Sequence, residues 1–357
     1  MYNTQVIFDE CHELFQKIDT NDFKNKNILI TGANGLIGGF LADFFNFLNL
    51  NHQYNINLYL TSYSSVDKLS RIPHLIGEDS VNYFSWDCSQ KINKDHLPDT
   101  IDYAFFCSGY GQPSKFLKNN IKTMLINIVG LESLLSYMNS AGGGNLLFLS
   151  TSEIYGDAPE EMLPTPEEYG GLYELLNNRA AYKESKKSGE VICKEYNSAE
   201  NMKVRIARIA LTYGPGALIT DNRVLQEFIF KAKNSGSIDM LDEGSSIRNY
   251  LYITDSAEIM LNIILKGTEI VYNVGGDNEP VSIFELASII AEKFNVNVIK
   301  GARKNAVNQS APKNVGLSMA RYRNEFVKDD NIKLTKGIQR TIDWFNFERN
   351  NKWLLIN

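Results

Sequence analysis

The chain is poor in the residues that disulfide-rich, zinc-binding and histidine-dependent proteins need. Of its 357 residues only four are cysteine and four are histidine, and no two cysteines form a Cys-x-x-Cys pair. The cysteines are therefore predicted to be reduced, mostly buried thiols rather than disulfides or zinc ligands. The histidines fall outside the motifs described below, so neither a Ser-His-Asp hydrolase nor a metal site is supported. These residues are Cys11, Cys88, Cys107, Cys193, His12, His52, His74 and His96.

Strong positive charge, long apolar runs and a leader segment are also missing. The formal net charge is −6 and no long basic run occurs, which argues against a nucleic-acid groove. We find no apolar stretch of the length needed to cross a bilayer. Residues 1–4 lack the basic start and the following apolar core of a signal peptide. The prediction is a cytoplasmic protein with no nucleic-acid or membrane partner.

A glycine-rich turn is the first positive signal. Thr31-Gly-Ala-Asn-Gly-Leu-Ile-Gly38 follows the apolar run 28–30 and leads into a helical pattern. Gly32 permits a tight turn, Gly35 lets the backbone approach a pyrophosphate, and Gly38 allows close packing of helix on strand. The helix N-terminus then offers unpaired N–H groups to phosphates. Such spacing also arises by chance in loops, but in this context it predicts a dinucleotide site.

Two further motifs follow the glycine-rich turn, and their order along the chain supports its interpretation as a dinucleotide site. Ser150-Thr-Ser-Glu-Ile-Tyr-Gly156 comes after the apolar run 146–149, and places hydroxyls and a carboxylate at the end of a predicted strand. Tyr182 is the only one of 18 tyrosines with a lysine four positions on, at Lys186. A phosphate-binding turn, a hydroxyl-and-carboxylate cluster and a Tyr-x-x-x-Lys helix together predict a site for hydride transfer.

Alternating strand and helix patterns predict the fold class. The prediction is an α/β protein with a Rossmann-type, doubly wound parallel sheet and a smaller C-terminal α/β substrate-binding domain. An accessory N-terminal helix occupies residues 1–25, the dinucleotide-binding domain residues 26–210, and the substrate domain mainly residues 211–357, with some exchange of segments. Strands are predicted at 27–31, 56–62, 81–86, 101–107, 145–151 and 203–209, and helices at 5–18, 34–49, 117–139, 179–198, 223–234, 255–266, 282–294 and 332–348. Short extended pieces are expected near 247–252 and 270–274, and a mobile loop at 302–316.

Five segments together resemble the extended short-chain dehydrogenases/reductases that act on nucleotide sugars. The resemblance spans roughly residues 26–295 and is closest to UDP-glucuronate decarboxylases and nucleotide-sugar 4,6-dehydratases. It is specific for the superfamily and much less so for the individual reaction. The segments are Arg179-Ala-Ala-Tyr-Lys-Glu-Ser-Lys186, Ala207-Arg-Ile-Ala-Leu-Thr-Tyr-Gly-Pro215, Asp221-Asn-Arg-Val224, Arg248-Asn-Tyr-Leu-Tyr-Ile-Thr-Asp255 and Asn273-Val-Gly275.

The resemblance implies catalytic roles for five residues. Tyr182 is the implied acid/base at the sugar C4 hydroxyl, and Lys186, with the cationic nicotinamide, is expected to lower the pKa of that phenol. Thr151 would hydrogen-bond the C4 oxygen. Ser152 and Glu153 permit proton transfer at C5 once C4 is a ketone, although Glu153 could also simply bind a sugar hydroxyl.

Four residues are implied on the substrate side. Arg223 and Arg248 would clamp the pyrophosphate, because guanidinium matches phosphate oxygens bidentately, and Gln112 and Tyr213 complete the set. The chain departs from its relatives at Leu211, where an Asn or His often touches the substrate. Substrate contacts in that corner therefore do not carry over.

The end of the second predicted strand bears on the choice of cofactor. NAD-dependent enzymes place an acid there to bind the ribose hydroxyls. This chain instead has Ser62 and Ser64, followed by Lys68 and Arg71, which suits the 2′-phosphate of NADP, with NAD as the alternative. Asp87 is expected near the adenine amino group. The other expected cofactor contacts are Gly32, Asn34, Gly35, Leu36, Ile37, Gly38, Cys88, Ser108, Gly109, Asn127, Ser150, Tyr182 and Lys186.

These predictions lead to NADPH-dependent reduction of a nucleoside-diphosphate 4-keto-6-deoxyhexose as the first hypothesis. The alternative is a UDP-glucuronate decarboxylase, or a 4,6-dehydratase or epimerase, that recycles bound NAD(P) without net redox change. A non-catalytic dinucleotide-binding regulator is the more distant alternative, because fold does not fix function. The apolar helices at 117–139 and 179–198 further predict a homodimer. No metal is expected.

Overall fold

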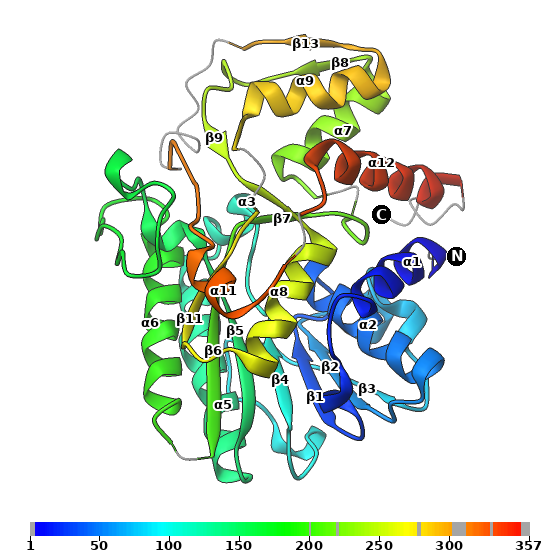
Figure 1. Ribbon diagram of the computed structural model, residues 1–357, viewed down its shortest axis with the longest axis vertical. Helices are drawn as coiled ribbons and strands as arrows, with labels where there is room; N and C mark the ends of the chain where they lie inside the picture. The colour runs from blue at the N-terminus through cyan, green and yellow to red at the C-terminus, as the bar shows by residue number, and fades with distance from the viewer. Residues whose placement is uncertain are drawn as a thin grey trace.

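A seven-stranded parallel sheet forms the centre of the protein (Figure 1). The computed structural model describes residues 4–199, 201–218, 221–276, 280–301, 312–328 and 331–350. The strand order is β11-β6-β5-β4-β1-β2-β3, so the chain winds outward in both directions from β1, as predicted. The strands are β1 (Asn27–Thr31), β2 (Asn57–Ser62), β3 (Val81–Ser85), β4 (Tyr103–Phe106), β5 (Gly144–Thr151), β6 (Met202–Ile209) and β11 (Val271–Val274).

Successive side chains of each strand serve two separate cores. Ile28 and Ile30 face one core whereas Leu29 faces the other, and Leu147 and Phe148 divide in the same way. Burial on both faces explains why these strands read as continuous apolar runs rather than as alternating patterns. The sheet is therefore covered on both sides by helices.

Different helices cover the two faces of the sheet. α2 (Leu36–His52) and α8 (Ile253–Lys266) cover one face, and α6 (Ala180–Tyr196) covers the other together with the run Asn120–Ser140. These strands and helices lie within a few residues of their predicted bounds. Among the described residues, the connection from β3 to β4 contains the single 3-10 turn η4 (Lys94–His96) and no α-helix.

The run Asn120–Ser140 corrects one statement made from the sequence. It consists of α4 (Asn120–Leu125), a π-helical segment η5 (Ile126–Gly130) and α5 (Leu131–Ser140). Its 21 residues, with a mean hydropathy of 1.2, are long and apolar enough to cross a membrane by length and composition alone. In the structure Leu131, Leu134, Leu135 and Met138 pack into the core beneath the sheet. One face of the run therefore belongs to the core.

The C-terminal half builds a second region above the sheet. Three two-stranded ladders join β7 (Leu211–Tyr213) to β10 (Tyr250–Tyr252), β8 (Ser237–Asp239) to β13 (Asn297–Ile299), and β9 (Ile247–Arg248) to β12 (Val281–Ser282). Helices α7 (Val224–Ser235) and α9 (Ile283–Phe294) complete it, and Ser282 and Glu285 form a capping box at the start of α9. The extended piece at 270–274 instead joins the main sheet as β11. Of the predicted loop 302–316, residues 302–311 lie outside the described residues.

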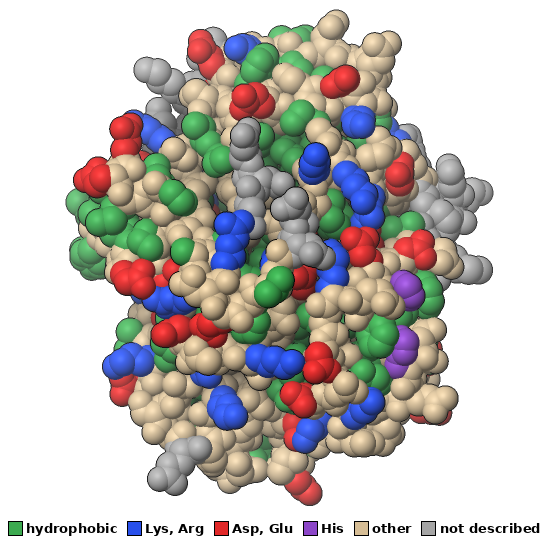
Figure 2. Space-filling model, in the orientation of Figure 1, with side chains coloured by type: hydrophobic (Ala, Val, Ile, Leu, Met, Phe, Trp, Pro, Cys, Tyr) green, Lys and Arg blue, Asp and Glu red, His purple; other side chains and the backbone are tan. Residues whose placement is uncertain are grey.

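The first and last described helices lie near each other. Helix α1 (Thr4–Phe15) packs against α2 and α8, with its Phe8 ring edge-on to Phe47 at 5.1 Å. Helix α12 (Leu334–Asn350) lies near α1 (Figure 1). On the face seen in Figure 2, acidic and basic side chains of the described residues are intermingled, so neither sign forms a continuous field there.

Candidate active site

The glycine-rich turn between β1 and α2 has the shape that a dinucleotide phosphate requires. Gly32 has φ +67, and a Cβ there would lie 2.8 Å from the Cys107 carbonyl oxygen. A Cβ on Gly38 would lie 2.6 Å from the Gly32 carbonyl oxygen. Gly35 is the N-cap of α2, whose first N–H groups are therefore available at this turn. Only glycine fits at Gly32 and Gly38, so the turn fits a dinucleotide.

Asn34 has a different role from the predicted one. Its Oδ1 accepts the backbone N–H groups of Ser70 and Arg71 at 3.0 and 2.8 Å. The side chain thus ties the segment after β2 to the glycine-rich turn. Leu36 and Ile37 open α2, and Ile37 also lines the cleft described below.

The cation pair predicted for a 2′-phosphate is not formed. Arg71 is 1% exposed and bonds Asp43 of α2 at 2.7 Å, so it points into the protein rather than toward a cofactor. Gly39 and Gly216 make room for it, because a Cβ at either position would lie within 2.6 Å of the Arg71 side chain. The prediction for Arg71 is therefore wrong, and Lys68 alone stays exposed beside this strand end.

The remaining groups near the predicted adenine side are engaged with one another. Ser62 is bonded to the Tyr83 hydroxyl at 2.8 Å, while Ser64 lies half-buried beside it and its carbonyl accepts from the same hydroxyl. Asp87 is paired with Lys122 of α4 at 2.8 Å, and this ammonium also lies 4.0 Å above the Tyr63 ring. Sequence reasoning missed Lys122, because 35 residues separate it from Asp87.

A cleft of about 170 Å³ brings all five predicted catalytic residues together at the carboxyl ends of β4, β5 and β6. This is the edge of a doubly wound sheet where ligands bind. Cys88 donates to the Ser108 hydroxyl at 3.1 Å beneath this edge. The lining residues include Ser108, Gly109, Ser150, Thr151, Ser152, Glu153, Tyr182, Lys186, Leu211 and Arg223.

Tyr182 and Lys186 come from successive turns of α6, but the pKa of Tyr182 is shifted in the direction opposite to the predicted one. Burial, and then the charge of Glu153, raise the pKa of Tyr182 to about 12, although its hydrogen bond with Thr151 opposes this. Lys186 donates to the Leu149 carbonyl at 2.6 Å, and burial lowers its pKa to about 8. In the protein by itself the pKa of Tyr182 is thus raised, not lowered.

An aromatic ring covers Tyr182. Phe116, from the short helix α3 (Pro113–Phe116), stacks parallel to it with ring centroids 4.4 Å apart and an interplanar angle of 6°. The guanidinium of Arg179 lies 5.0 Å from the centroid of the Phe116 ring. The predicted substrate residue Gln112 is half-buried as the N-cap of this helix. No motif pointed to Phe116.

Glu153 is held by a residue that the sequence reasoning quoted but did not assign. It lies on the 3-10 turn η6 (Ser152–Tyr155), whose N-cap Thr151 accepts the Glu153 N–H at 3.2 Å. Arg179 is 4% exposed and bonds both Glu153 oxygens, through Nε at 2.8 Å and through Nη2. Such a bidentate pair fixes the carboxylate in one orientation. The Arg-x-x-Tyr spacing on α6 was the available signal.

The two substrate arginines lie close to the β7–β10 ladder, Arg223 as the N-cap of α7 and Arg248 at the end of β9. Arg223 lines the cleft, pairs with Asp221 and donates to the Thr212 carbonyl at 3.3 Å. Arg248 stands two residues before β10 and donates to the Ile247 carbonyl at 2.7 Å, and burial lowers its pKa. Burial raises the pKa of the Tyr250 hydroxyl, and the charges of both guanidiniums oppose that rise.

Two residues predicted to contact ligands are buried and bonded to other protein groups. Tyr213 is 2% exposed, its ring packs against Tyr250 and Tyr252, and its hydroxyl points to the Leu334 carbonyl, so its predicted contact with substrate is wrong. Asn127 is fully buried in η5, where its amide donates to Thr123 and Ser185. It supports α6 from below and is not among the residues lining the cleft.

Two curated relatives are similar to this chain in sequence. UDP-glucuronic acid decarboxylase 1 of Danio rerio is 26% identical over 328 residues, covering 90% of this chain and 73% of the relative. The Xenopus tropicalis protein of the same name is 28% identical over 268 residues, covering 75% of this chain and 60% of that protein.

Solved structures share the fold at lower identity. An epimerase of Methanothermobacter thermautotrophicus superposes with a TM-score of 0.77 at 20% identity, covering 98% of this chain and 99% of that one. The dTDP-glucose 4,6-dehydratase of Bacillus anthracis, in complex with NAD, gives 0.73 at 18% identity, covering 92% and 98%. A family described as the NAD dependent epimerase/dehydratase family matches residues 28–275, from β1 to the end of β11. The match covers more than half of the chain and includes the parallel sheet with its cleft. The chain therefore belongs to this family and is an enzyme of the short-chain dehydrogenase type.

Proposed function

We propose that this enzyme acts on a uridine-diphosphate uronate, oxidises the sugar transiently at C4 and removes the C5 carboxyl group as carbon dioxide. The observation that carries the proposal is the position of Glu153, held by Arg179, in the same cleft as Thr151 and Tyr182. The curated relatives that are UDP-glucuronic acid decarboxylases supply the substrate class.

The chain's own groups divide the work between C4 and C5. Ionised Tyr182 takes the proton of the C4 hydroxyl, while Thr151 holds the C4 oxygen by a hydrogen bond. When bound along the glycine-rich turn, Ser108 and Lys186, a nicotinamide dinucleotide supplies reversible hydride exchange at C4. A carboxyl group β to the resulting ketone leaves as carbon dioxide, and the electron pair of the broken C5–C6 bond passes into the C4 enolate. Glu153 then passes to C5 a proton taken up from water, and this proton replaces the lost carboxyl group.

The pKa of Tyr182 supports a requirement for positive charge in this step. A phenol whose pKa is raised to about 12 is a poor base at neutral pH. A cation arriving next to it, such as an oxidised nicotinamide ring, favours the phenolate. Lys186 is 5% exposed and anchored to Leu149, in a place suited to holding the ligand ribose rather than the phenol.

NAD is the proposed cofactor, although NADP was the first prediction. With Arg71 directed inward, one of the two cations that favoured a 2′-phosphate is withdrawn. The family is NAD dependent by its description, and an enzyme that returns its hydride within one turnover has no need for the NADPH pool.

A second candidate is NADPH-dependent reduction of a nucleoside-diphosphate 4-keto-6-deoxyhexose. It is favoured by one specific observation: β2 ends in hydroxyl residues without a carboxylate, and Lys68 is exposed nearby. A 4,6-dehydratase or epimerase uses the same C4 chemistry and would be expected to use the same cleft.

The deciding experiment supplies UDP-glucuronate with NAD, and separately dTDP-4-keto-6-deoxyglucose with NADPH. Carbon dioxide release from the first, with no net change in nicotinamide absorbance, is the expected result. Stoichiometric loss of NADPH with the second would instead establish the reductase. Tyr182→Phe is the control, because loss of the C4 acid/base should lower turnover by about two orders of magnitude or more while leaving cofactor binding intact.

The segments after residue 210 are proposed to carry the nucleotide-sugar site, since Arg223 and Arg248 both belong to them. A cytoplasmic location and a homodimer complete the proposal. The dimer is supported by exposed apolar residues on the helices of one face, Ile121 of α4 at 70% and Val191 of α6 at 60%. Helix α1 packs on α2 and α8 and so leaves that face open.

A further inference from the structure

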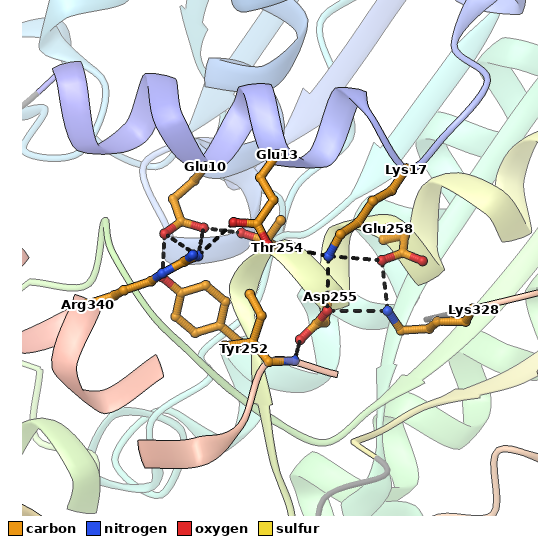
Figure 3. A network of polar contacts seen from close by, with 10 residues as sticks. Glu10, Glu13, Lys17, Tyr252, Thr254, Asp255, Glu258, Lys328 and Arg340 are labelled. Carbon is orange, nitrogen blue, oxygen red and sulfur yellow. Dashed lines mark hydrogen bonds and ion pairs between the residues drawn. The ribbon is translucent and has the colours of Figure 1, made fainter. Parts of the chain in front are cut away.

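Helix α1 precedes the segment matched by the family and has two distinct faces. Ile7, Cys11 and Leu14 are buried in the core shared with α2. On another side Glu10, Glu13 and the following Lys17 point toward residues of β10, α8 and α12 (Figure 3). An amphipathic helix needs only the first face to be held in place. The charged face therefore requires a separate explanation.

Glu10 is the centre of this charged face. It is 4% exposed and accepts hydrogen bonds from the Tyr252 hydroxyl and the Thr254 hydroxyl, each at 2.6 Å. Arg340 of α12 donates to both Glu10 oxygens at 3.2 Å. A buried carboxylate with four such contacts is fully hydrogen-bonded, and removing it leaves its partners unsatisfied.

A second set of contacts fixes the start of α8 next to Glu10. Asp255, fully buried in the first turn of α8, lies 3.3 Å from Lys328 and 3.8 Å from Lys17. Glu258 lies 2.7 Å from Lys328 and 3.9 Å from Lys17 (Figure 3). Since α8 follows β10 without a loop, α1 constrains strand and helix at their junction.

The strand that Glu10 holds leads directly to the substrate arginines. Tyr252 packs edge-on against Tyr213, which packs in turn against Tyr250, with ring centroids 5.6 and 6.1 Å apart. Arg248 stands two residues before Tyr250, and Arg223 donates to the carbonyl of Thr212 in β7. Arg223 thus contacts β7 directly, whereas Arg248 lies on β9, which pairs with β12, and is joined to β10 through Asn249.

We infer that Glu10 is a positioning residue through which the N-terminal helix holds the β7–β10 ladder, and with it Arg223 and Arg248, in the geometry that binds a nucleoside diphosphate. The ligand class rests on the proposed function. The other part of the inference does not depend on the proposed function: α1, which lies outside the segment matched by the family, orders the β7–β10 ladder.

The test compares Glu10→Ala with Glu13→Ala in the full chain. Glu13 lies on the same helix and bonds the same Arg340, but no hydrogen bond joins it to the ladder among the described residues. Hydrogen exchange of residues 211–213 and 250–256 should accelerate tenfold or more in Glu10→Ala, with β1, β4 and β5 unchanged, and neither effect is expected in Glu13→Ala. Calorimetric titration with UDP should show at least fivefold weaker binding by Glu10→Ala and wild-type affinity for NAD.

Tyr252→Phe keeps α1 in place and removes one hydroxyl, so it should change the same two measurements in the same direction by a smaller factor. Equal exchange in Glu10→Ala and wild type, or an acceleration spread evenly over the whole sheet, would overturn the inference. Should the wild type bind neither UDP nor dTDP, the proposed substrate class fails, while the exchange comparison still decides the role of Glu10.

Discussion

At the scale of single residues, burial changes what the recognised motifs do. Tyr182 and Lys186 stand one helical turn apart as their spacing predicts, yet each is shifted by desolvation, the tyrosine toward a higher pKa and the lysine toward a lower one. Arg71 and Tyr213, both assigned to ligands from sequence, lie inside the protein. Residue type and spacing identified the chemistry, but not which groups face the cleft.

Lys186 should make stability depend on pH in a defined window. Burial lowers its folded pKa from 10.5 to about 8, so between these values the unfolded chain binds more protons than the folded one. Stability contributed by this group therefore rises with pH across that window and is least below it. In Lys186→Met this dependence is absent. Urea unfolding should show the wild type gaining roughly 1–3 kcal/mol relative to the variant between pH 8 and pH 10.5. A constant difference would contradict a buried, titrating lysine.

Arg71 and Lys68 should separate stability from cofactor choice. Arg71→Met leaves the buried Asp43 carboxylate with His74 at 2.7 Å but without its guanidinium. This change should cost roughly 1–3 kcal/mol of unfolding free energy and leave the ratio of NADP⁺ to NAD⁺ affinity unchanged. Lys68→Ala is exposed, so it should leave stability unchanged and weaken the binding of NADP⁺ but not of NAD⁺. Chemical denaturation and fluorescence titration with each cofactor measure both. A changed cofactor ratio in Arg71→Met would restore the original assignment of Arg71.

At the scale of elements, turns and caps are decided by close approaches of backbone. The turn 32–38 is built from three glycines, of which Gly32 and Gly38 meet backbone atoms at distances no Cβ tolerates. The loop of α3 places Phe116 on Tyr182, and η6 turns Glu153 toward Arg179. The strands and long helices agree with prediction because their burial patterns are continuous in sequence.

Gly38→Ala should disable the dinucleotide turn while Gly170→Ala should not. The added Cβ at Gly38 would stand 2.6 Å from the Gly32 carbonyl oxygen, whereas nothing lies within 4 Å of a Cβ at Gly170. Overpacking of this kind costs about 1–3 kcal/mol, and the turn must move away from phosphate-binding geometry to relieve it. We expect at least tenfold weaker NAD binding in Gly38→Ala by fluorescence titration. Wild-type affinity in that variant would show that the turn does not contact the cofactor.

At the scale of the whole molecule, segments distant in sequence share one support. The chain's first and last described helices, α1 and α12, meet at Glu10 and Arg340 and brace the strand that precedes α8. The face formed by α4 and α6 lies on the opposite side of the sheet from α1 and α12 and presents exposed apolar residues.

The exposed face of α4 and α6 leads to a prediction about assembly. Light scattering at micromolar concentration should give about twice the 40.4 kDa mass of one chain. Val191→Asp places a charge on the exposed middle of α6 and should shift the mass toward one chain without lowering the melting temperature appreciably. Val66, exposed at 52% outside these helices, provides the matched control Val66→Asp. A monomeric wild type would refute the dimer.

By itself, the sequence determined the sheet, its winding, the three motifs and the family, because these depend on local patterns: apolar continuity, glycine spacing and one helical turn between Tyr182 and Lys186. Tertiary structure alone decided that Arg179 holds Glu153, that Phe116 covers Tyr182, that Arg71 pairs with Asp43, and that Glu10 reaches Tyr252 across 242 residues. Pairings of this kind depend on which side chains the packed layers bring within hydrogen-bonding distance and remove from water. That geometry is set by the whole chain at once and leaves no periodic trace along it.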